Sequence, residues 1–147
     1  MTTQARPGAP NLVTGYPRSP NEMLGPFVLL PRILDKCRAV LAGTHGDYKF
    51  NCPLDKRFFE FFKVDAEAFK AEVAAGKTDE EMLAWVEAHL NEHATLEAIR
   101  TWAYQERWRR PTEAMIPHFE AMREELAPNN HRVETWFQLL DADEGRF

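Results

Sequence analysis

The chain has 147 residues, the size of a single domain. Its 23 acidic and 18 basic residues give a net charge of −5, which argues against broad nucleic-acid binding because that needs a basic surface. The short basic run Arg107, Arg109 and Arg110 is too small to change this balance. Hydrophobic residues supply 44% of the chain, yet no apolar stretch approaches the roughly 20 residues of a membrane-spanning helix.

Residues 1–26 are predicted to form an irregular arm, followed by one helical domain, residues 27–147. The arm is rich in Pro, Gly and Ser, and its prolines are Pro7, Pro10, Pro17, Pro20 and Pro26. Because proline lacks the amide hydrogen and clashes with the preceding turn, no long helix fits there. An ordered arm needs a surface to lie on, which we expect to be its own domain or a neighbouring subunit.

Four helices are predicted in the first two thirds of the domain. Residues 29–43 form the first, because apolar residues recur at three- and four-residue steps between Pro31, which suits a first turn, and Gly43, which suits a C-terminal cap. The second runs from about residue 53 to residue 62. The third begins after Asp65 and ends at Gly76, and the fourth begins at the capping box in "TDEE".

The rest of the chain is also predicted to be helical. Residues 79–110 contain no Gly or Pro, so they form one long helix or two; a break near residues 91–95 is favoured, since Asn91 and Thr95 are good caps. A further helix spans residues 111–126, with Pro117 in or near its first turn. The last covers residues 129–140 and buries Val133, Trp136, Phe137 and Leu140. Without strand pairs or repeats, the predicted fold is all-α, a compact bundle of six or seven helices.

One side of the first helix carries Arg32, Asp35 and Lys36, opposite its apolar stripe. A solvated face with internal charge pairs is the ordinary explanation, and such pairs contribute only about 0–1 kcal/mol. The alternative is an anion-binding site, in which Arg32 and Lys36 donate to a phosphate or carboxylate and Asp35 orients them. That site needs a cover, which we expect from the arm with Tyr16 and Arg18.

The segment that contains this triplet resembles a known family. It reads "PRSPNEMLGPFVLLPRILDKCRAVLAGTHGDYKFNCPLDKRFFEFF" and is similar to small bacterial proteins grouped as domain of unknown function 5069. The resemblance covers about residues 16–90 and departs from the family at Pro26. It implies no activity. It does imply a set of residues that occur together, namely Arg18, Arg32, Asp35, Lys36 and Tyr48.

Two other patterns are weighed for chemistry. His89 and His93 have the i, i+4 spacing of a two-histidine metal site, but a third ligand such as His118 or His131 would have to come from elsewhere. No metal site is therefore predicted. Cys52 precedes Pro53 at a helix start, where a thiol can become reactive, yet no orienting residue accompanies His45, so Cys52 is expected to be an apolar filler.

The N-terminus has no secretory signal, and Cys37 and Cys52 show neither CxxC spacing nor a disulfide framework. A reducing cytoplasm is therefore expected. The chain contains no serine nucleophile motif, phosphate loop or nucleotide fingerprint, and no cofactor is expected. Aromatic residues on several sides of the segment around Trp102, Tyr104 and Trp108 indicate burial or a subunit interface.

These observations predict a cytoplasmic, bacterial protein that binds a small anionic molecule or a partner through the arm and first helix. Arg32 and Lys36 would donate, and Arg18 and Tyr48 would line the rim. An enzyme is the first alternative, with Asp35 as base and Lys36 or Tyr48 as acid; an enclosed Asp35 beside a cavity would favour it. A structural assembly subunit is the second. No membrane or nucleic-acid partner is expected. Self-association through the aromatic C-terminal half is expected.

Overall fold

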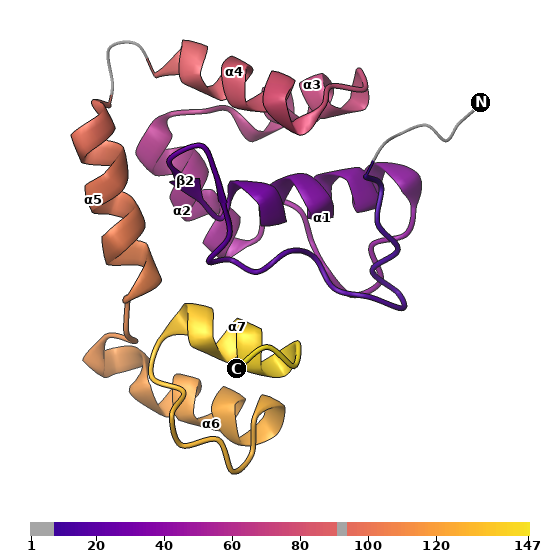
Figure 1. Cartoon of the computed structure of the whole chain (residues 1–147). Coiled ribbons are helices and arrows are strands. Elements are labelled where there is room, and N and C mark those ends of the chain that lie inside the picture. The colour runs from indigo at the N-terminus through magenta and orange to yellow at the C-terminus, as the bar shows by residue number, and fades with distance from the viewer. Residues whose placement is uncertain (1–7, 91–93) are drawn as a thin grey trace.

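A computed structural model describes residues 8–90 and 94–147, which form seven α-helices and one small β-hairpin. The helices stack in layers (Figure 1): α3 and α4 lie above α1 and α2, and α6 and α7 lie below them. Helix α5 runs along one side of these layers, and the chain passes through it from the upper to the lower layer. This arrangement confirms the predicted helical fold. The element bounds are β1 Met23–Leu24, β2 Phe27–Val28, α1 Leu30–Ala42, α2 Pro53–Phe62, α3 Ala66–Ala74, α4 Asp79–His89, α5 Leu96–Arg107, the 3₁₀ turn η2 Glu113–Met115, α6 Ile116–Leu126 and α7 Trp136–Asp143.

Local capping explains where most helices begin and end. The Asp65 side chain accepts from the Ala68 amide at the start of α3, and Thr78 and Glu81 form the predicted capping box of α4. Gly43 ends α1 in the left-handed conformation, as predicted. Thr95 caps α5, so the predicted break between α4 and α5 is confirmed; Asn91 lies outside the described residues.

Two predictions about regular structure were wrong. Met23–Leu24 and Phe27–Val28 pair as an antiparallel hairpin around Gly25, which has φ +57. The last helix begins only at residue 136, because Thr135 and Gln138 form a capping box there. This start turns Leu139 into the core and leaves Trp136 and Leu140 half-buried, contrary to prediction.

The core has two parts. The larger one joins β2 and α1–α5, and its centre is a group of aromatic rings. The ring centroid of Phe62 lies 4.8 Å from that of Phe58 and 5.1 Å from that of Trp102. The smaller one holds α6 against α7 through Phe119, Val133 and Leu139. No helix in the described part of the chain has the length and apolar character to span a bilayer.

From residue 8 onward, the arm lies against the domain. Leu12, Pro17, Ser19 and Pro20 are buried, and the Leu12 amide donates to the Thr44 carbonyl at 2.7 Å. The loop after α1 approaches the arm so closely that a Cβ on Gly46 would lie 2.9 Å from the Leu12 carbonyl oxygen. Gly46 also has φ +57, so glycine is required there for both space and conformation.

We therefore expect Gly46→Ala to destabilise the protein by about 2–4 kcal/mol, from backbone strain and displacement of the arm. Gly43→Ala is the matched control. It has φ +74 but no neighbour within 4 Å, so it should cost only about 1–2 kcal/mol. Denaturant unfolding measures both variants, and hydrogen exchange at the Leu12 amide should accelerate in Gly46→Ala alone. Equal effects of the two substitutions would refute the close approach.

Candidate functional site

The charged side of α1 is covered. Arg32, Asp35 and Lys36 are 2%, 8% and 3% exposed, so the solvated-face explanation does not hold. Their partners are not each other, as that explanation required, but residues of the arm, α2 and the end of α7. The expected cover by Arg18 is confirmed, whereas Tyr16 stays exposed and takes no part.

Arg32 is neutralised by Glu144, which directly follows α7. Its two terminal nitrogens donate to the two Glu144 oxygens at 2.9 and 2.6 Å, a bidentate pair with almost no solvent contact. The Tyr48 hydroxyl donates to the same carboxylate at 2.7 Å, and Arg146 donates to it as well. Burial alone would raise the pKa of Glu144, but these donors outweigh burial and lower it. Burial and the bond to Glu144 raise the pKa of Tyr48, so its hydroxyl stays protonated.

Lys36 is neutralised by Asp55, which lies in the first turn of α2. Its Nζ atom lies 2.8 Å from Asp55 Oδ1 and 3.3 Å from Cys52 Sγ. The other Asp55 oxygen accepts from the Asn51 amide at 2.9 Å and holds the left-handed Asn51 backbone, which has φ 61. One buried carboxylate therefore fixes both the α1 lysine and the loop that enters α2.

Asp35 is neutralised by Arg18 of the arm. Both its oxygens accept from the Arg18 guanidinium, at 2.9 and 3.0 Å, and the Arg18 amide adds a third bond. Asp79, the first residue of α4, accepts from Arg18 and from Arg38 of α1. Burial opposes the charge on Arg18 and on Asp79, yet the bonds to Asp35 and Asp79 raise the pKa of Arg18, and the bonds from Arg18 and Arg38 lower the pKa of Asp79. The arm, α1 and α4 are thereby tied together.

The predicted acid–base residues Asp35, Lys36 and Tyr48 thus pair with three different partners, Arg18, Asp55 and Glu144. Asp35 is enclosed and borders a hollow between the arm, α1 and α4, which is the condition stated for the enzyme alternative. However, Lys36 bonds to Asp55 and Tyr48 to Glu144, and in the described part of the chain neither shares a hydrogen bond with Asp35. In this structure the triplet and its partners hold three segments on α1, and the prediction that they contact a ligand remains a prediction.

A second hollow, of about 470 Å³, has a different charge. It lies beside the loop of residues 45–51 and is lined by three lysines and one carboxylate. Lys49 comes from the loop, Lys56 from α2 and Lys70 from α3, and Glu67 is the carboxylate. In the described residues, Lys49 and Lys70 have no ion pair, whereas Lys56 donates to the Asn51 carbonyl at 2.7 Å. The hollow therefore offers, next to the Glu67 carboxylate, two cationic groups that form no ion pair with a described residue.

Tyr48 and His45 also border this hollow. Tyr48 is the one residue of the predicted site that does so. His45 brings a buried Nδ1 atom without a protein partner among the described residues. The lysines were missed at the sequence level because they come from a loop and two helices, so no spacing marks them as a set. Glu144, Asp55 and Asp79 were missed for the same reason.

The histidine and cysteine patterns are less informative. His89 is exposed and contacts its own helix, with Nδ1 2.9 Å from the Trp85 carbonyl oxygen; His93 lies outside the described residues. His118 and His131 are exposed, and within residues 8–90 and 94–147 no three potential ligands gather at one place. Cys37 is buried, which raises its pKa to about 12 and makes it unreactive. Cys52 is half-buried and contacts Lys36, with no hydrogen bond to His45 in the described residues.

The chain belongs to the family described as Domain of unknown function (DUF5069), which matches residues 14–146. The match therefore continues well beyond residue 90, where the resemblance was expected to end, and includes Glu144 and the other C-terminal residues that complete the α1 networks. No curated protein matches the chain.

The Arg32–Glu144 pair is expected to be strongly coupled. Arg32→Met and Glu144→Gln should each cost about 3–5 kcal/mol, because the first removes the buried bidentate donor of Glu144 and the second removes the carboxylate that neutralises Arg32. The double variant should lose about 1–3 kcal/mol less than the sum. Urea unfolding of all four proteins measures this coupling. The exposed pair Arg110–Glu134, 3.0 Å apart, is the control and should give about 0–1 kcal/mol. Additive losses at Arg32 and Glu144 would contradict the assignment.

Stability should fall in acid. Because the pKa of Glu144 is lower in the folded protein than its ordinary value of 4.5, the unfolded chain binds the proton first. The contribution of the ionised Glu144 to folding stability is complete above pH 4.5 and is lost as the pH falls through the pKa of Glu144 in the folded protein. Glu144→Gln should therefore be less stable than wild type at pH 7 but lose less stability between pH 5 and 3. Denaturant midpoints across this range measure the slope, and an unchanged slope would assign the acid sensitivity to other groups.

Proposed function

We propose that the protein binds a small anionic ligand in the hollow beside residues 45–51. The observation that carries the proposal is the set of three lysines, Lys49, Lys56 and Lys70, around one carboxylate, Glu67. In an otherwise acidic chain, this concave surface concentrates positive charge. Its volume of about 470 Å³ is in the range of small-molecule sites.

The internal pairing of the α1 charges favours a ligand site at this hollow and not at the first helix. Arg32 and Lys36 would have to leave Glu144 and Asp55 to bind an external anion, which would strand two buried carboxylates. Lys49 and Lys70 form no ion pair with a described residue, so binding an anion would break no internal pair. Tyr48 keeps its hydroxyl proton and lies at the border, where it links the hollow to the Arg32 network.

A thermal-shift screen with inorganic phosphate, pyrophosphate and citrate tests the proposal. A ligand that binds only the folded state raises apparent stability, by about 2.7 kcal/mol at a concentration of 100 Kd. Calorimetric titration of the strongest ligand then gives its Kd, which we expect Lys70→Ala and Lys49→Ala to raise about tenfold or more. Raised ionic strength should weaken binding as well.

Lys77→Ala is the matched control, because it removes one positive charge outside the hollow, from a half-exposed pair with Glu72. It should bind as wild type does. An anion that binds all variants equally would place the site elsewhere, and the absence of any shift with all three anions would refute this class of ligand.

We further propose that the protein associates with itself, with the outer aromatic residues at the contact. Trp102 is buried in the core, but Tyr104 and Trp108 are 66% and 52% exposed. Interfaces concentrate such side chains. Sedimentation over a range of protein concentrations tests this proposal, and a monomer at every concentration would refute it.

The two unpaired cysteines and the resemblance to bacterial proteins support a reducing bacterial cytoplasm as the location of the protein.

A further inference from the structure

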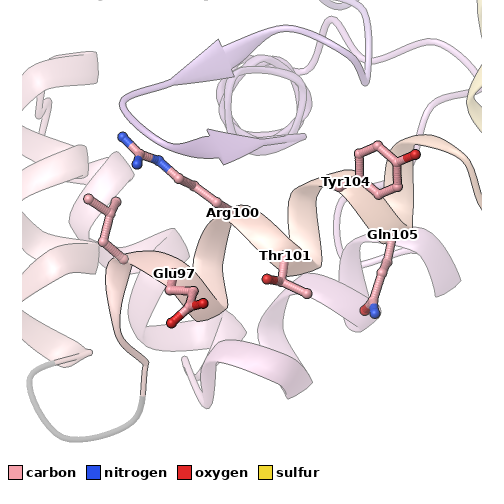
Figure 2. Close-up of a pocket in the computed structure, with 6 residues that line it drawn as sticks. Glu97, Arg100, Thr101, Tyr104 and Gln105 are labelled. Carbon is pink, nitrogen blue, oxygen red and sulfur yellow. The ribbon is translucent and has the colours of Figure 1, made fainter.

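The outer face of α5 presents two parallel rows of side chains. In Figure 2, Arg100 and Tyr104 lie on one side of the helix axis, and Glu97, Thr101 and Gln105 lie on the other. Leu96, four residues before Arg100, extends the first row by helical spacing. Rows at four-residue spacing are the ridges that interlock when helices pack.

The groove between these rows has no second wall. It measures about 660 Å³, and all the residues that line it belong to α5. Its apolar members are unusually open, with Leu96 and Tyr104 among the exposed large hydrophobic side chains. A helix that lies in this groove would supply the missing wall and cover both.

The charges on the two rows indicate which helix would bind in this groove. The row of Arg100 has no acidic residue, and the row of Glu97 has no basic one. Within the described residues neither Arg100 nor Glu97 takes part in an ion pair. A second α5 therefore carries the complementary charges, provided that each row faces the opposite row of the other copy.

Symmetry then fixes the direction of the second helix. If the two-fold axis lay between the copies at right angles to α5, the helices would be antiparallel and each row would face its own copy, so that Arg100 would have no acidic residue opposite it. If the axis runs parallel to α5 between the copies, the helices are parallel and the rows exchange, so that Arg100 of each copy faces the row that carries Glu97 of the other. Opposite charges across the contact favour the parallel arrangement, whereas the antiparallel one brings no opposite charges together.

We propose that two copies of this chain pair through the outer faces of α5. The two helices are parallel and are related by a two-fold axis that lies between them and runs parallel to them. The inference rests on the proposed self-association and specifies its surface. Leu96 and Tyr104 provide the apolar contact, and the two reciprocal Arg100–Glu97 pairs set the direction. One face of a 12-residue helix is small beside standard interfaces, so the dimer is a weak one that forms on concentration.

Charge reversal tests the arrangement in the full-length protein. Arg100→Glu and Glu97→Arg should each raise the dimer dissociation constant about tenfold or more, because each creates two like-charge contacts. The double variant restores both pairs with the signs exchanged, and its dissociation constant should return to within about threefold of wild type. Arg110→Glu, beyond α5, should have no effect. Sedimentation velocity over a concentration series measures all five proteins, and circular dichroism confirms their helical content.

The outcomes separate the two proposals. A wild-type protein that is monomeric throughout refutes self-association and this face together. A wild-type dimer that both single reversals leave intact refutes only the α5 face. A dimer that both reversals weaken without rescue in the double variant keeps α5 in the interface but refutes the parallel pairing.

Discussion

The buried Arg32–Glu144 pair is the interaction on which the rest of this structure depends. A guanidinium in the first turn of the central helix is stable there only because a carboxylate from the far end of the chain reaches both of its terminal nitrogens. Glu144 in turn holds Tyr48 of the loop after α1. The charge on one residue therefore requires the C-terminal segment and that loop to be in place together.

The same requirement repeats along α1. Asp35 requires Arg18 of the arm, and Lys36 requires Asp55 of α2. Charged side chains that would ordinarily face water thus fix the arm, α2 and the C-terminal segment on α1. The proline-rich arm lies on the domain in this way, because the Arg18 bonds add to the burial of Leu12 and Pro17.

Internal pairing also limits where this protein can carry out function. Cations held by buried carboxylates are unavailable to a ligand, whereas groups without an ion pair among the described residues remain available. Lys49 and Lys70 at the hollow beside residues 45–51, and Arg100 and Glu97 on α5, are such groups. The two surfaces use different chemistry: a concave cationic site suits a small anion, and an apolar helical groove with separated charges suits another helix.

The sequence by itself determined the helices and their caps, because these depend on neighbours within a few residues. Asp65, Thr78 and Thr95 cap α3, α4 and α5 where local pattern places them, and the unusual charged side of α1 was visible from spacing alone. The hairpin at residues 23–28 was missed because two-residue strands are too short to show alternation. Only the tertiary structure decided that Arg32 meets Glu144, that Lys36 meets Asp55, and that three lysines share one hollow. Those contacts join residues from separate elements, and their formation depends on how whole helices pack, which no local pattern encodes.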